Sequence, residues 1–301
     1  MTLELKNVTK RFGSFTAVDN LSLEIPENNI FGFLGANGAG KTTTFRMILN
    51  LIDQSDGSIT WNGEEINYNN SDRIGYLPEE RGLYPKLKVR DQLIYLGKLR
   101  GLSKNDASNE LKKWLDRLKV PQYLDKKVEE LSKGGNQQKI QFISAVIHKP
   151  KLLILDEPFS GLDPVNVEML KEAVEELGRS GTSIVFSSHR MEHVEQLCEH
   201  LCMLQKGKTI LHGNLKEIKR SFGKKNLSIE ADCDLDFVNQ IPGVLKTTPP
   251  YSGGMVCQIE SEAVSQAVLE KLIGKGFIRK FELDEPSLND IFIEKAGESY
   301  E

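Results

Sequence analysis

Residues Gly35–Thr43 read Gly-Ala-Asn-Gly-Ala-Gly-Lys-Thr-Thr, and their types and spacing suit the binding of a nucleoside triphosphate. The stretch fits the pattern Gly-x4-Gly-Lys-[Ser/Thr], in which glycines let backbone N–H groups turn toward phosphate oxygens. Lys41 is expected to reach the β- and γ-phosphates, and the Thr42 hydroxyl to ligate Mg²⁺. An apolar run, Ile30–Leu34, precedes the stretch and helical spacing follows it. These flanks disfavour the alternative, a glycine-rich turn that merely precedes a helix.

A second group of polar residues follows two further apolar runs. The run Lys151–Leu155 ends in Asp156 and Glu157, where Asp156 suits a Mg²⁺ shell and Glu157 can orient an attacking water. His189 follows the predicted strand Gly181–Ser187 and fits a third polar group at the γ-phosphate. Strands often end in Asp-Glu, and a lone histidine at a strand end is usually structural. The catalytic interpretation therefore depends on the phosphate loop.

The bulk composition is that of a globular protein. A length of 301 residues suggests about two domains. Apolar content is 39%, charged content is 27%, and the net charge of −4 gives no sign of a nucleic-acid partner. No run approaches the roughly 18 apolar residues of a membrane helix. The N-terminus lacks the pattern of a signal peptide, which predicts a chain that stays in the cytosol.

Four cysteines are too few for a disulfide framework. Cys198 and Cys202 lie four apart with His193 and His200 nearby, a spacing that also permits a metal site. No second pair at finger-like spacing accompanies them, and their neighbours are apolar. We therefore expect these cysteines to pack in the core.

The chain divides into two predicted domains. Residues 1–222 alternate short apolar runs with helical stretches, as an α/β P-loop domain does, and contain an all-helical insert at about 85–149. Residues 223–301 follow the order βαββαβ, which predicts a small α+β domain of ferredoxin-like plan with a short final helix. The expected strands are 226–231, 244–248, 255–260 and 277–283, and the expected helices are 235–241, 262–273 and 286–295.

Taken in order, these motifs resemble the nucleotide-binding subunits of ATP-binding-cassette (ABC) transporters over about residues 1–220. Leu131–Gln138 resembles the family signature that opens a helix, Ser160–Asp163 the loop that touches a partner subunit, and His189 the switch histidine. The runs Glu79–Pro85 and Glu285–Phe292 resemble the corresponding segments of a narrower group within this family. That group comprises ATPase subunits of bacterial exporters with separately encoded permeases, including the sodium-efflux type.

The resemblance implies a set of site residues. Phe12 matches the aromatic that stacks on adenine, although it could instead be a core residue beside Val8. Glu79 stands where the family usually has Gln and still offers an oxygen to Mg²⁺. The implied catalytic residues are Glu157, His189 and Lys41, and the implied Mg²⁺ ligands are Thr42, Glu79 and Asp156. ATP is expected to contact Phe12, Val18, Asn37, Gly38, Ala39, Gly40, Lys41, Thr42 and Thr43, and Ser132, Gly134, Gly135, Asn136 and Asp163 in trans.

The signature departs from the family pattern in length. The usual forms are Leu-Ser-Gly-Gly-Gln and Leu-Ser-Lys-Gly-Asn, and Lys133–Asn136 makes this one a residue longer. It remains open which glycine N–H reaches the γ-phosphate. If one glycine loops out, Gly135 and Asn136 open the helix.

The resemblance implies that two such subunits sandwich two ATPs and drive a membrane permease, which docks beside Glu79–Tyr84 and the helical insert. We therefore expect an ATPase at the cytoplasmic face of the membrane that powers export and requires ATP and Mg²⁺. Its partners would be the permease and a second ATPase subunit, identical or different. Neither the substrate nor the role of residues 224–301, regulatory or passive, follows from the sequence.

Two alternatives differ in class. The first is a soluble cassette ATPase in repair, translation or cluster assembly. The repair proteins carry a long coiled coil, and the translation proteins carry two cassettes in one chain. The cluster-assembly proteins normally lack a C-terminal domain like residues 224–301. The second is a non-catalytic regulator, which would be expected to lack Glu157 or His189; both are present.

Overall fold

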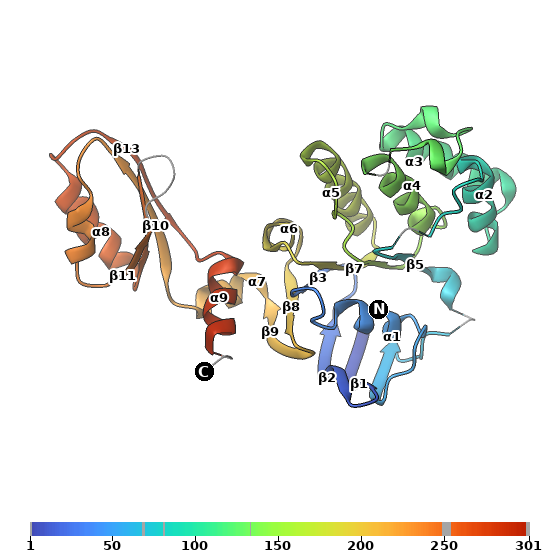
Figure 1. Cartoon of the computed structure of the whole chain (residues 1–301), viewed down its shortest axis with the longest axis horizontal. Coiled ribbons are helices and arrows are strands. Elements are labelled where there is room, and N and C mark those ends of the chain that lie inside the picture. The colour runs from blue at the N-terminus through green and yellow to red at the C-terminus, as the bar shows by residue number, and fades with distance from the viewer. Residues whose placement is uncertain (1, 68–69, 81, 133, 249–253, 299–301) are drawn as a thin grey trace. The chain divides into compact units, whose positions relative to one another are not determined.

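The computed structural model describes residues 2–67, 70–80, 82–132, 134–248 and 254–298 (Figure 1). The chain forms two compact units, Met1–Gly213 and Asn214–Glu301. Helix α7 (Leu215–Ser221) lies within the first predicted domain and is counted in the second unit. Each unit has a hydrophobic core of its own.

A six-stranded sheet of order β5-β6-β7-β3-β8-β9 forms the centre of the first unit. Neighbouring strands from β5 to β8 pair in parallel. Strands β6 and β7 are buried along their whole length. Their sequences therefore do not alternate between apolar and polar residues, as those of half-exposed strands do. The predicted strands before the phosphate loop, Asp156 and His189 are confirmed. The strands are β3 (Ile30–Leu34), β5 (Ile74–Leu77), β6 (Leu152–Leu155), β7 (Ser183–Ser188), β8 (His200–Gln205) and β9 (Lys208–Asn214).

An antiparallel sheet of order β2-β1-β4 packs against helix α1. It consists of β1 (Leu3–Phe12), β2 (Phe15–Ile25) and β4 (Asp56–Trp61), and α1 spans Lys41–Ile48. The ring of Phe33 on β3 lies 5.4 Å from that of Phe45 on α1. This contact belongs to the core that supports the phosphate loop between those two elements.

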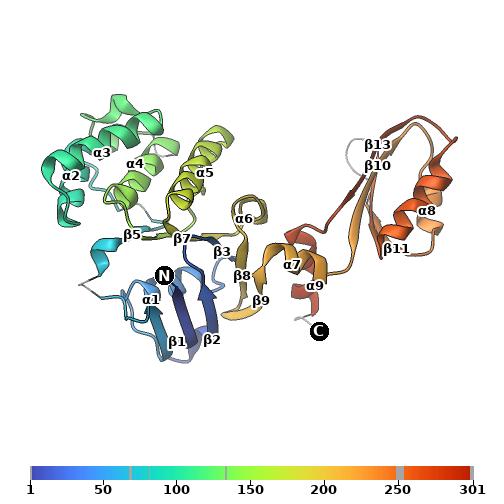
Figure 2. The same ribbon diagram turned by 180° about the vertical axis from the view of Figure 1, so that it is seen from behind.

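The remaining helices of the first unit surround the parallel sheet. Figures 1 and 2 show α2, α3 and α4 grouped on one side of this sheet and strands β1 and β2 on the other. The described part of 85–149 contains helices and no strand. The elements are η1 (Ser71–Arg73), α2 (Val89–Leu99), α3 (Lys104–Arg117), η2 (Pro121–Tyr123), η3 (Val128–Glu130), α4 (Gly135–Val146), α5 (Pro164–Arg179) and α6 (Met191–Leu197).

The second unit contains an antiparallel sheet of order β11-β12-β10-β13, the ferredoxin-like arrangement. The first predicted helix, 235–241, is only a short 3-10 helix, η4 (Asp236–Gln240). Pro242 follows it, and the residue before a proline is pushed to extended geometry, as Ile241 is. The other elements are β10 (Lys225–Ala231), β11 (Val244–Thr248), β12 (Met255–Ile259), α8 (Glu262–Leu272), β13 (Ile278–Asp284) and α9 (Leu288–Glu298).

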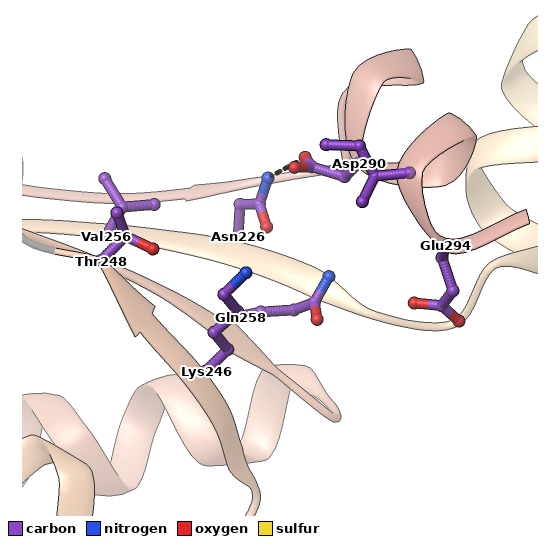
Figure 3. A pocket seen from close by; sticks show the side chains of 8 residues that line it. Asn226, Lys246, Thr248, Val256, Gln258, Asp290 and Glu294 are labelled. Atoms are coloured by element: carbon purple, nitrogen blue, oxygen red, sulfur yellow. Dashed lines mark hydrogen bonds between the residues drawn. The ribbon is translucent and has the colours of Figure 1, made fainter. Parts of the chain in front are cut away.

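The two faces of this second sheet differ. Apolar side chains such as Leu227 and Cys257 are buried beneath α8. The opposite face and α9 enclose a polar pocket of about 300 Å³ (Figure 3). There Asn226 Nδ2 donates a 2.8 Å hydrogen bond to Asp290 Oδ2. Asp290 also accepts hydrogen bonds from the backbone N–H and hydroxyl of Ser287, which secure the first turn of α9.

The paired cysteines lie in the core of the first unit. Cys198 follows α6 and is 6% exposed, and Cys202 on β8 is fully buried. Both are free thiols, and burial raises the pKa of the Cys202 thiol to about 12. The expectation of core packing is confirmed.

Candidate nucleotide-binding site

The phosphate loop joins β3 to α1 through glycines that no other residue type could replace without strain. Gly35, Gly38 and Gly40 all have positive φ angles, of 152°, 80° and 107°. A Cβ atom on Gly35 would lie 2.4 Å from the Leu204 carbonyl oxygen, and one on Gly40 would lie 2.7 Å from that of Ala17. The loop backbone therefore rests directly on neighbouring backbone, which the missing side chains allow.

A cleft of about 380 Å³ opens at this loop. It brings the loop together with two carboxylates that are distant in sequence, Glu79 from the segment after β5 and Glu157 from the segment after β6. The lining residues are Phe15, Ala17, Asn37, Gly38, Ala39, Gly40, Lys41, Thr42, Thr43, Glu79 and Glu157.

Two of the ATP contacts expected from the same chain are not among the residues that line the cleft. Val18 is fully buried, and its neighbour Ala17 reaches the cleft wall instead. Phe12 is 51% exposed, so the interpretation of Phe12 as a core residue is wrong. Phe15, which pairs with Phe12 across the β1–β2 turn, lines the cleft and is 63% exposed. None of the sequence motifs points to Phe15, although its place in that turn is a usable signal.

Lys41 is held at the mouth of the loop. Its Nζ donates hydrogen bonds to the carbonyl oxygens of Gly35 at 2.6 Å and Ala36 at 3.3 Å. The same atom lies 3.4 Å from Glu157 Oε1, and both side chains are more than 90% buried. The ammonium group is therefore positioned between the phosphate loop and the second carboxylate.

Asp156 and Glu157 are organised by one hydroxyl group, that of Ser187 on β7. Ser187 Oγ donates to Asp156 Oδ1 at 2.6 Å and accepts from the backbone N–H of Glu157 at 2.8 Å. Glu157 has a positive φ of 49°, a strained conformation for a residue other than glycine. No sequence motif points to this role of Ser187, because contacts between neighbouring strands are not visible in a linear motif.

Each of these carboxylates keeps one oxygen without a hydrogen-bond donor. Within the described residues, Asp156 Oδ2 and Glu157 Oε1 are buried and accept no hydrogen bond, although Lys41 forms an ion pair with the latter. Burying a carboxylate oxygen without a donor is unfavourable. The chemistry of these two oxygens suits a divalent cation and a water molecule.

The other oxygen of Glu157 contacts His189. His189 Nδ1 lies 2.9 Å from Glu157 Oε2, and because an ionised carboxylate can only accept, the imidazole N–H donates. The His189 side chain is 47% exposed. The three expected catalytic residues, Lys41, Glu157 and His189, are thus in contact.

Tyr76 on β5 lies beside this charged group. Burial, and then the negative charge of Asp156, raise the pKa of the Tyr76 hydroxyl to about 12. The Tyr76 phenol therefore stays protonated to a higher pH than an ordinary tyrosine.

The signature residues lie elsewhere on the first unit, at the start of α4. The helix begins at Gly135, as expected if one glycine loops out, and Lys133 lies outside the described residues. Asn136 Nδ2 donates to Ser132 Oγ at 3.0 Å. A Cβ on Gly135 would lie 2.5 Å from Asn166 Nδ2 on α5, so a larger residue at this position would displace the Asn166 side chain.

Asp163 lies at the start of α5. Its carboxylate accepts a 3.0 Å hydrogen bond from the backbone N–H of Asn166 and caps the helix. This bond lowers the pKa of Asp163. Neither Asp163 nor Ser132, Gly134, Gly135 or Asn136 is among the residues that line the cleft.

Comparisons with known proteins show the family of the chain. Residues 18–160 match the ABC transporter family profile, and residues 213–296 match the C-terminal domain of DrrA1-3-like ATP-binding proteins. The uncharacterized ABC transporter ATP-binding protein YhaQ of Bacillus subtilis is 64% identical over 99% of this chain and 100% of its own length. The chain belongs to the ABC transporter ATP-binding proteins.

Two further matches, a curated relative and a solved structure, are also similar to this ABC ATPase subunit. Nod factor export ATP-binding protein I of Cupriavidus metallidurans is 32% identical over 98% of this chain and 97% of its own length. A solved ATP-binding subunit of an ABC transporter is 28% identical, with a TM-score of 0.69 over 74% of this chain and 94% of that chain. Among the described residues of the ABC subunit, no helix has the length and apolar character to cross a membrane.

Proposed function

We propose that this ABC subunit hydrolyses ATP with Mg²⁺ to power export through a separate membrane permease at the cytoplasmic face of the membrane. The observation that carries the proposal is the buried contact of Lys41, Glu157 and His189 at the end of the phosphate loop. The name of the Nod factor export relative supports the direction of transport.

The buried acceptors suit the metal. Thr42 and Glu79 line the cleft, and Asp156 Oδ2 is a buried oxygen that receives no hydrogen bond from the described residues. We assign these three residues to Mg²⁺, which supplies positive charge against the phosphates when bound. The assignment gives a partner to an oxygen whose burial is otherwise unfavourable.

The remaining residues hold the nucleotide and the attacking water. Lys41 is expected to exchange its loop carbonyls for phosphate oxygens, since its ammonium is already at the loop. Glu157 Oε1 is the oxygen available to accept a proton from water, and His189 fixes the carboxylate through Oε2. Phe12 or Phe15, both exposed near the start of β2, is proposed to stack on the adenine.

The cleft of one chain lacks part of the proposed machinery. The signature residues and Asp163 are not among its lining residues, so a second subunit has to supply them. The start of α4 would then present backbone N–H groups and its positive dipole end to the γ-phosphate. A dimer, of identical or different subunits, is therefore part of the proposal.

A groove of about 750 Å³ beside the helical insert is the proposed permease site. It is lined by residues of η1, β5, α2 and α4, including Tyr76, Leu96, Leu99 and Arg100. Leu96 and Leu99 contribute apolar surface to this groove, and Leu99 is 62% exposed. A short apolar helix of the permease with a polar flank fits this lining.

The substitution Glu157→Gln tests the catalytic part. The variant should bind MgATP, hydrolyse little of it and accumulate as an ATP-bound dimer, because the amide cannot accept the proton of the water. Steady-state ATPase rates and size-exclusion chromatography with ATP measure both outcomes. Turnover within about threefold of wild type would remove Glu157 from this role.

A photocrosslinking amino acid at position 99 tests the permease partner. It should capture a multi-span membrane protein from native membranes, identified by mass spectrometry. The matched control is position 51, because Leu51 is 61% exposed and lies outside the groove. Equal yields from both positions, or capture of soluble proteins only, would contradict docking at the groove.

A further inference from the structure

Helix α4 carries two buried glutamines on its inner face. Gln138 is 7% exposed and Gln141 is 3% exposed, three residues apart and therefore on one side of the helix. A buried side-chain amide is unfavourable unless it is hydrogen-bonded. Both amides are bonded, and their partners are the loops that carry the carboxylates of the cleft.

Gln141 binds the backbone on both sides of Glu79. Its Nε2 donates to the carbonyl oxygen of Pro78 at 3.2 Å and to that of Glu80 at 3.0 Å. Both acceptors are carbonyls, so the amide nitrogen uses its two protons on them. Outside regular helices and strands, no backbone N–H of the described residues donates to either carbonyl.

Gln138 makes the corresponding contact with the second loop. Its Nε2 donates to the carbonyl oxygen of Pro158 at 3.1 Å, directly after Glu157. The far end of the first loop is held in a similar way from α2, where Gln92 accepts from the N–H of Tyr84 at 2.8 Å and donates to its carbonyl at 3.0 Å. Side-chain amides of the helical insert therefore hold both loops.

We propose that Gln141 is a positioning residue that fixes the Glu79 carboxylate in the nucleotide cleft. It acts from the helix whose first residues form the signature, so a shift of α4 is transmitted to Glu79 in the same chain. The inference rests on the proposed role of Glu79 beside Mg²⁺. Gln141 thereby links two regions of one chain. One region is the start of α4, which is proposed to contact the partner subunit, and the other is the Glu79 carboxylate, which is proposed to bind Mg²⁺.

The link is measurable as metal selectivity of ATP binding. Without Mg²⁺, a correctly placed Glu79 repels the γ-phosphate, and with Mg²⁺ it is a ligand. The ratio of ATP affinities with and without Mg²⁺ therefore reports the position of Glu79. A change that only lowers the stability of the fold weakens both affinities alike and leaves the ratio unchanged.

The experiment compares Gln141→Met, Glu79→Gln, the double variant and Gln92→Met in the full chain, by equilibrium binding of ATP with and without Mg²⁺. Gln141→Met keeps the side-chain volume and removes both donors. Gln92→Met is the matched control, because it removes two hydrogen bonds to the same loop but none next to Glu79. We expect Glu79→Gln and Gln141→Met each to lower the ratio by about three- to tenfold. The double variant should match Glu79→Gln, and Gln92→Met should match wild type.

Each other outcome counts against a defined part of the inference. If Glu79→Gln lowers the ratio and Gln141→Met does not, Gln141 does not position Glu79, and the metal role of Glu79 stands. If neither changes the ratio, Glu79 is not at the metal side, and the inference fails together with that assignment. If Gln141→Met does not fold, Gln141→Asn replaces it, since it keeps a polar amide one methylene too short to reach both carbonyls. An unchanged ratio in that variant overturns the inference in the same way.

Discussion

Replacing Ser187 by alanine should destabilise the chain and slow ATP hydrolysis together, because one hydroxyl group holds both the Asp156 carboxylate and the backbone of Glu157. The Oγ atom donates to Asp156 and accepts from the backbone N–H of Glu157. Alanine removes both bonds and leaves Asp156 without a hydrogen-bond donor from the described residues. It also frees the backbone N–H of Glu157, whose φ is strained.

The magnitude follows from the two bonds. A hydrogen bond to a charged group contributes about 1.5–3 kcal/mol, and an unsatisfied buried N–H costs about 1–3 kcal/mol. We therefore expect a loss of about 2.5–6 kcal/mol in the free energy of unfolding, a large part of the roughly 5–15 kcal/mol of a typical domain. The looser carboxylates should lower kcat by about ten- to a hundredfold, or about 1.4–2.7 kcal/mol in activation free energy.

Urea unfolding and steady-state ATPase assays measure these two effects. The control is Ser183→Ala on the same strand, because Ser183 is also buried and, within the described residues, its hydroxyl accepts a single hydrogen bond, from the Asn28 N–H at 3.0 Å. This control should cost about 1 kcal/mol. If Ser187→Ala costs no more than the control and leaves kcat within about threefold, the reasoning from the shared hydroxyl is refuted.

Three further predictions concern the base, the signature and pH. Phe12→Ala or Phe15→Ala should weaken ATP binding by about 1–3 kcal/mol, measured by equilibrium titration; the affected variant identifies the stacking ring, and no effect in either excludes both. Deletion of Gly134 restores the family spacing and should raise ATPase activity or tighten the ATP-bound dimer, whereas a drop in both would show that the longer loop is the working form. Burial, then Arg190 and Lys171, lower the pKa of His193 from 6.5 to about 4. As the pH falls below 6.5, His193 of the unfolded chain therefore binds a proton before His193 of the folded chain does, which favours unfolding. Between pH 7.5 and pH 5, the free energy of unfolding should fall by about 2 kcal/mol more in wild type than in His193→Gln. Urea unfolding at the two pH values measures this difference.

Local patterns identified the elements that carry the site. The strand–loop–helix around Lys41 and the strand ending in Asp156 were visible because each lies within about ten consecutive residues of distinct composition. The alternation of strand β12 was visible for the same reason. The order of elements in the second unit was read from a series of such local segments. The prediction of a regular helix over 235–241 was wrong. Pro242 pushes the residue before it to extended geometry, and only the five-residue 3-10 helix η4 forms.

Contacts between distant segments were beyond these patterns. Ser187 is about thirty residues from Asp156, and Gln141 is about sixty from Glu79, so no spacing rule connects them. Phe15 was missed because a turn decides which of two aromatics faces the cleft, and Val18 was assigned to the nucleotide although packing buries it.

The sequence by itself therefore determined the residue types that can hold phosphate and polarise water, because these chemistries need short, contiguous motifs on a strand end or a helix start. The tertiary structure alone decided which hydroxyl and amide groups orient those residues. Parallel strands place their carboxyl ends side by side only when the sheet forms, and a buried donor must then find its acceptor among whatever neighbours the packing brings. Ser187 and Gln141 acquire their partners at that step, and no earlier property of the chain specifies them.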